Sequence, residues 1–228
     1  MQIIDTGALG TRSAVLRLRR RGSQLNFVVF PMMHVATPGF YAEVRRRLAG
    51  CAVVVAEGVS GRTVISSAIT LTYRVIPANR RSGLVQQHID YHSLGVPVIN
   101  PDVTAEEFTR SWRTLPLGYR VLMWCVLPVI VLMQLSGGRK RLLAPNVRVD
   151  DDDLPEHEME ERFDKVFGGE RDDRLFAALA ELHETRGAER IDVGIVYGAG
   201  HVGEFVHRLA ATLGYRPRDA EWITVIDW

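Results

Sequence analysis

Ile191-Asp-Val-Gly-Ile-Val-Tyr-Gly-Ala-Gly-His-Val-Gly203 is the stretch of sequence that decides the fold. The apolar run 191–197 predicts a buried strand, and the glycines at 198–200 predict a tight turn. Apolar residues at helical spacing then predict a helix over 201–213, which Gly214 ends. A final strand is predicted at 222–226. This order of strand, helix and strand is typical of a βαβ unit in an α/β protein.

A similar unit is predicted near the start of the chain. Alternating residues favour strands at 13–19 and 25–30, joined by a turn at 21–24 and ended by Pro31. Thr37 and Pro38 are typical of a helix start, and this helix is predicted to reach Ala49. The apolar run 51–56, bounded by two glycines, predicts a buried central strand.

Weaker patterns fill the middle of the chain. They predict a helix at 84–94, a strand at 96–100, and helices at 104–112 and 170–186, with Thr104 and Glu107 as a capping box. We therefore expect one α/β domain over residues 1–228, with a mixed central sheet. Its two related βαβ-like halves, at about 1–113 and 158–228, bracket a helical insertion at about 114–157.

Composition narrows the class of protein. The 228 residues include 28 Lys or Arg and 27 Asp or Glu, so the net charge of +1 gives no case for nucleic acid as a partner. Cys51 and Cys125 both lie in apolar stretches, which argues against a disulfide scaffold or a cysteine-based zinc site. The first residues show no apolar signal core, so the protein is expected to be cytoplasmic.

One apolar segment departs from this picture. Val121–Met133 is uncharged, contains Pro128, and is flanked by Arg120 and by the basic run 139–141. A membrane span needs about 20 apolar residues, so this run is short for one. The alternatives are a buried helix or oligomer contact, a surface that touches a membrane or covers the site, and a true span. Membrane association thus stays open.

Three titratable residues follow three predicted strands. His34, Glu57 and His201 each lie next to tight-turn residues. Ligands bind α/β sheets at the carboxyl ends of the strands, so we expect the three side chains to share a site. Each alone is ordinarily a solvated or hydrogen-bonded surface residue. Together they are a sound ligand set for a divalent metal, or a metal-free acid–base group with a histidine as general base.

Other residues are weaker candidates. Arg171 opens the helix at 170–186, where it could clamp an anion or Glu57. Tyr197 precedes the glycine turn and could donate to an oxyanion. Asp102 follows a fourth strand. The glycines at 198, 200 and 203 also match a dinucleotide fingerprint, but too little chain follows to build the second half of that fold. The acidic run 150–161 is expected to be solvated rather than a calcium loop.

These motifs resemble those of the TraB/PrgY–Tiki superfamily, which is related to erythromycin-esterase-like and ChaN-like proteins. The resemblance covers about 27–215 and rests on Phe30-Pro-Met-Met-His34, Val53-Val-Val-Ala-Glu57, Glu170-Arg-Asp172, Val196-Tyr-Gly-Ala-Gly-His201 and Gly214-Tyr215. Pro31 stands where the family usually has glycine, and Pro101 where it usually has arginine. The resemblance implies an α/β fold of two related halves, with a site of two histidines and a glutamate at the strand ends.

Members of this superfamily differ in activity. Tiki-like members resemble metal-dependent proteases, and esterase-like members use histidine and glutamate in hydrolysis. TraB/PrgY-like members act in peptide-pheromone shutdown, and ChaN-like members bind haem. We therefore expect a metal-dependent hydrolase of peptide or amide bonds, in which His34, Glu57 and His201 hold Mn, Co or Zn and Arg171 and Tyr197 stabilise the oxyanion. The alternative is a non-catalytic protein that sequesters a peptide or haem in the same crevice.

Overall fold

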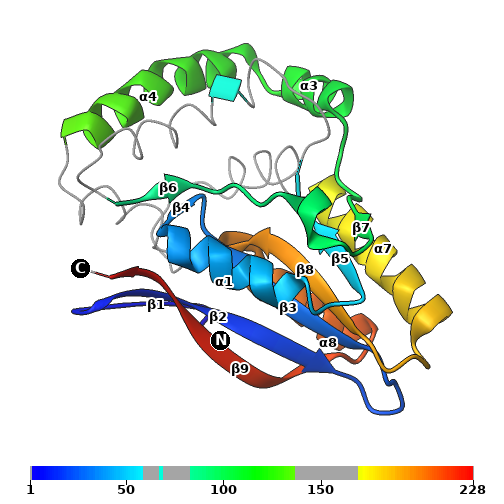
Figure 1. Cartoon of the computed structure of the whole chain (residues 1–228). Coiled ribbons are helices and arrows are strands. Elements are labelled where there is room, and N and C mark those ends of the chain that lie inside the picture. Colours follow the sequence, from blue (N-terminus) through cyan, green and yellow to red (C-terminus); the bar gives the residue numbers. More distant parts are fainter. Residues whose placement is uncertain (1, 59–66, 69–82, 137–168, 228) are drawn as a thin grey trace.

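A computed structural model describes residues 2–58, 67–68, 83–136 and 169–227 (Figure 1). The central sheet has seven strands. Six of them are paired in the order β1-β2-β3-β8-β5-β7, and the seventh, β9, also pairs with β2. Their bounds are β1 Ile4–Gly7, β2 Gly10–Arg19, β3 Asn26–Met32, β5 Val53–Ala56, β7 Val98–Ile99, β8 Asp192–Gly198 and β9 Arg216–Asp227. A small second sheet pairs β4 (Val35–Ala36) with β6 (Val85–Gln86).

Strand direction follows from the pairing. β3, β8, β5 and β7 form a parallel series, whereas β2 is antiparallel to each of its neighbours β1, β3 and β9. Among these seven strands, therefore, only β2 runs against the rest. The predicted α/β fold with a mixed sheet is confirmed.

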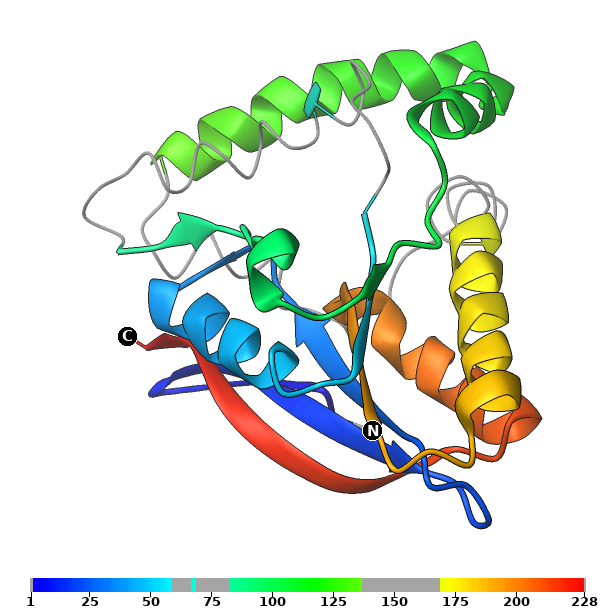
Figure 2. The same ribbon diagram turned by 45° about the vertical axis from the view of Figure 1, so that its right-hand side comes forward.

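Helices cover both faces of this sheet. α1 (Pro38–Leu48) lies on one face, and α7 (Glu170–Arg186) and α8 (Ala199–Thr212) lie on the other (Figures 1 and 2). α3 (Ala105–Thr114) and α4 (Leu117–Ser136) lie apart from the sheet, and a short 3-10 turn occupies Tyr91–Leu94. Among the described residues, no helix is long and apolar enough to cross a membrane.

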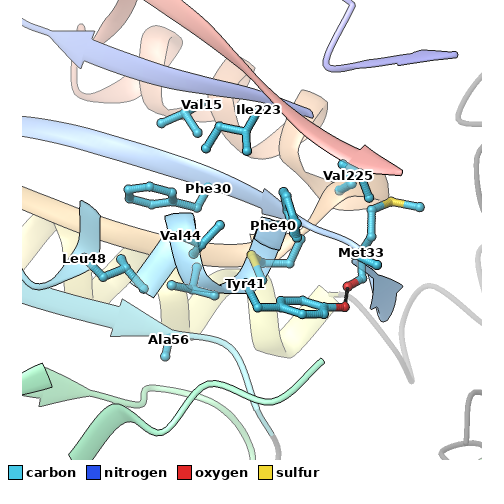
Figure 3. Close-up of a cluster of buried hydrophobic side chains, with 14 of the residues drawn as sticks. Val15, Phe30, Met33, Phe40, Tyr41, Val44, Leu48, Ala56, Ile223 and Val225 are labelled. Atoms are coloured by element: carbon cyan, nitrogen blue, oxygen red, sulfur yellow. Dashed lines mark hydrogen bonds between the residues drawn. The ribbon is translucent and has the colours of Figure 1, made fainter. Parts of the chain in front are cut away.

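Each face of the sheet has its own apolar core. Between α1 and the sheet, Phe30, Phe40, Val44 and Leu48 are buried together (Figure 3). The hydroxyl of Tyr41 donates to the Met33 carbonyl over 2.7 Å, so this buried polar group is satisfied. The opposite core joins β2, β3, β5 and β8 to α7 and α8. The strand alternation that predicts the sheet thus supplies side chains to both layers.

Local signals act as predicted at several helix ends. The Thr37 hydroxyl accepts from the Phe40 N–H, and Thr104 and Glu107 form the full capping box. Gly214 ends α8 with φ of +71°, a left-handed conformation that glycine adopts without strain.

Three element predictions are wrong. Residues 84–94 do not form a helix, because strand β6 pairs with β4 there and a 3-10 turn follows. Pro31 does not end its strand, since β3 continues through it and the Ser13 hydroxyl donates to its carbonyl over 2.8 Å. The last strand begins at Arg216, well before the predicted 222, because pairing with β2 extends it. The acidic run 150–161 lies outside the described residues.

Candidate active site

The carboxyl ends of three parallel strands meet at one edge of the sheet. Met32 of β3 pairs with Gly198 of β8, and Ala56 of β5 pairs with Val196 of β8. After β3 the chain crosses to α1 on one face, whereas after β8 it enters α8 on the other face (Figure 2). Neighbouring parallel strands whose helices leave to opposite faces form a topological switch point, where α/β proteins bind ligands.

Glu57 is the fixed centre of this edge. Its Oε1 accepts from Arg171 Nη2 over 2.9 Å, and its Oε2 accepts from the backbone N–H of Gly198 over 2.7 Å. The carboxylate therefore joins β5 to both α7 and the turn after β8. Glu57 keeps 23% of its side chain exposed, so it can still meet a ligand.

Arg171 is held mainly by Asp102. Its Nε and Nη2 each donate to this carboxylate over 2.7 Å. Burial opposes the charge of Arg171, but the bonds to Asp102 and the charge of Glu57 outweigh it and raise its pKa. Of the two roles that the sequence allows for Arg171, these contacts favour the clamp on Glu57 over an oxyanion donor.

Asp102 is more central than the sequence suggests. Its side chain is only 3% exposed, and it also accepts from the backbone N–H groups of Gly58 (2.8 Å) and Val103 (2.7 Å). Asn100 supports the same loop by donating to the Gly58 carbonyl over 2.8 Å. The sequence did mark Asp102 as a candidate, because it follows a fourth strand. A sequence does not reveal, however, which cation a buried carboxylate binds.

The two histidines lie beside this network. His34 follows β3, and its pKa is lowered chiefly because surrounding protein atoms displace water; Glu57 opposes the change, and the charges of Arg171 and His201 add to it. As a residue, His34 is nevertheless exposed. His201 lies in the first turn of α8, half-buried. A side-chain carbon placed on Gly198 would lie 3.3 Å from Glu57 Oε2 and 3.7 Å from His201 Cδ2, so this glycine leaves room between the two side chains.

The Tyr197 side chain lies on the face of the sheet that α7 and α8 cover. It belongs to the core under α7 and α8, and its hydroxyl donates to Asp172. The ring lies 5.9 Å from that of His201. Because the hydroxyl donates to Asp172 in this arrangement, Tyr197 supports the shape of the site rather than offering a donor to it. Asp172 is a contact that the sequence analysis did not identify.

The residue types at this edge suit a divalent metal ion, but the way in which they are arranged does not. Two imidazoles and one carboxylate are a common zinc set. However, both oxygens of Glu57 already accept hydrogen bonds, one of them from the cationic Arg171, whose charge would repel a metal ion. Within the described part of the chain, no three His, Cys, Asp or Glu side chains are grouped as metal ligands. As they are arranged, His34, Glu57 and His201 do not fit a metal ion.

The start of α8 adds polar groups to this edge. The first N–H groups of a helix lack partners within the helix and carry partial positive charge. Gly200 is exposed, and an added side-chain carbon there would meet no atom within 4 Å. A ligand can therefore approach the backbone at this point. A hollow of about 740 Å³ lies at the opposite edge of the sheet, near Arg17 and Arg190, and includes none of the candidate residues.

We assign the candidate active site to the edge of the sheet where β3, β5 and β8 end, because the titratable side chains gather there. The structure brings Glu57, Arg171 and Asp102 into direct contact and sets His34 and His201 beside them. No family model matches this chain, and neither a curated protein nor a solved structure does. The resemblance to the TraB/PrgY–Tiki superfamily therefore stays a prediction.

Proposed function

We propose that this chain is a hydrolase of peptide or amide bonds, with its active centre at His34, Glu57 and His201. One observation carries the proposal: a carboxylate fixed by an arginine and a backbone N–H lies beside two imidazoles, at the switch point of the sheet. Perturbed titratable groups at the switch point of an α/β sheet are typical of catalytic sites.

The residues suit acid–base hydrolysis. A lowered pKa keeps His34 neutral near pH 7, so its imidazole can take a proton from water as the oxygen attacks the carbonyl carbon. A histidine then returns a proton to the amine as the C–N bond breaks. Glu57 stabilises the charged imidazole, and the N–H groups at the start of α8 would stabilise the oxyanion.

The metal-dependent part of the expected activity is not proposed, because His34, Glu57 and His201 as arranged do not fit a metal ion. A divalent ion would supply a more acidic water and polarise the carbonyl. No step above depends on it, because both Glu57 oxygens are engaged in the described arrangement. Elemental analysis of protein purified without chelator tests this part directly. Metal content that falls in His34→Ala and His201→Ala would support a metal site, and unchanged content in both would remove it.

The hydrolase proposal is tested with a panel of fluorogenic peptides and amides. We expect His34→Gln, His201→Gln and Glu57→Gln each to lower kcat/KM about 100-fold or more, with unchanged circular dichroism. His207→Gln is the matched control, since His207 is an exposed histidine on the same helix as His201. Activity that survives all three substitutions would contradict the proposal.

Sequestration of a peptide or haem is the second candidate. The exposure of His34 is the observation in its favour, because a histidine that a ligand can reach is able to bind it without catalysing a reaction. In that case the panel is not cleaved, and added haem gives a Soret shift that His34→Gln or His201→Gln abolishes. No shift in the wild-type protein would exclude the haem form of this function.

A further inference from the structure

Helix α4 exposes a large apolar surface. Leu117 is 70% exposed, and Val121 and Val129 are each 53% exposed. The remaining members of this α4 surface are Leu122, Trp124 and Val126. None of the α4 side chains that the structure describes belongs to either core of the sheet. The apolar segment predicted from the sequence is therefore a helix, and its described side chains are not buried in the fold.

The exposed side chains surround much of this helix. At about 100° per residue, Leu117, Trp124, Val121, Leu122 and Val126 span more than half of the circumference. A helix that packs on a protein core has a narrower apolar stripe and a polar opposite face. These exposed side chains give α4 a broad apolar face with which to enter the acyl boundary of a bilayer.

The charged residues of the described stretch 108–136 are all arginines. Arg110, Arg113 and Arg120 precede or enter the helix, and none of them forms an ion pair with another described residue. In the sequence, no acidic residue occurs between Glu107 and Asp150. The apolar surface thus lies in a cationic stretch of chain.

We propose that α4 binds the surface of an anionic lipid bilayer, lying in the plane of the interface. Apolar side chains would enter the acyl boundary while arginines meet lipid phosphates, as in interfacial helices. Trp124 suits this depth, since tryptophan favours membrane–water interfaces.

The position of α4 gives this contact a consequence. α4 lies on the side of the molecule toward which the carboxyl ends of β3 and β5 point (Figures 1 and 2). A bilayer bound there would therefore lie on the same side as the candidate active site. The contact itself does not depend on hydrolysis, so either proposal can fail without the other.

Vesicle flotation tests the contact. We expect the full-length protein to float with vesicles of phosphatidylcholine and phosphatidylserine, but weakly with phosphatidylcholine alone, and less as NaCl rises. Val121→Glu with Val129→Glu should weaken binding about tenfold or more, because two apolar contacts are lost and two negative charges approach the lipid. Arg110→Gln with Arg113→Gln should reduce the preference for the anionic vesicles.

Leu9→Glu is the control, because Leu9 is an apolar residue, 89% exposed, in the turn between β1 and β2. Its binding should equal that of the wild type. No flotation, or equal binding to both vesicle types, would overturn the proposal. Association in the absence of lipid that Val121→Glu abolishes would assign the surface to a second copy instead. Protein that resists extraction with alkaline carbonate would indicate a span and would also overturn it.

Discussion

Arg171→Met is expected to destabilise the fold by about 3 kcal/mol. The change removes two hydrogen bonds of 2.7 Å to Asp102 and one of 2.9 Å to Glu57. Asp102 is 3% exposed, so its charge would stay buried without its cation. Removing one partner of a buried ion pair costs about 3–5 kcal/mol. We take the lower end, because the N–H groups of Gly58 and Val103 still bind this carboxylate.

Thermal or urea unfolding measures this loss. For a domain of this size 1 kcal/mol shifts Tm by about 2–4 °C, so the expected decrease is about 6–12 °C. Arg174→Met is the matched control on the same helix. Its bidentate pair with Glu107 is about one-third exposed on each side, and such pairs contribute less than about 1 kcal/mol.

A second variant separates charge from packing. Adding Asp102→Asn to Arg171→Met removes the stranded charge but leaves one acceptor for the N–H groups of Gly58 and Val103, so the double variant should be at least as stable as Arg171→Met alone. The reasoning is refuted if Arg171→Met unfolds at the same midpoint as Arg174→Met, or if the double variant is less stable than the single one.

Three further predictions concern other parts of the molecule. Gly194→Ala should cost about 1–3 kcal/mol by thermal unfolding, because its methyl would lie 3.1 Å from Cys51 Sγ and 2.8 Å from a neighbouring leucine; an unchanged Tm would contradict this close packing. Burial, and then the charge of Arg20, lower the pKa of His183 below 6.5, so the folded state binds fewer protons than the unfolded state. The stability of the fold should therefore fall as pH drops from about 6.5, and His183→Gln should flatten that dependence. Burial raises the pKa of Cys51 to about 11, so iodoacetamide at pH 8 should label only the exposed Cys125 quickly, and Cys125→Ser should abolish the fast phase seen by mass spectrometry.

Local patterns predicted most of the regular elements. The apolar runs at 51–56 and 191–197 contain most of the buried strands β5 and β8, and the capping residues Thr37 and Thr104 begin helices. The prediction failed at 84–94, where periodicity over a short window does not distinguish a helix from residues that pair with β4. It also failed at Pro31, because β3 stays paired with the parallel strand β8 through this residue as far as Met32.

The sequence by itself determined the α/β class and put His34, Glu57 and His201 after strands, because strand periodicity and glycine turns are local properties. Only the tertiary structure decided that β8 lies between β3 and β5, which brings those strand ends to one edge. It also decided that Arg171 donates hydrogen bonds to Glu57 and to Asp102, which lies 69 positions before it in the chain. Ion pairs between distant residues depend on how helices and strands pack, and no local pattern encodes that distance.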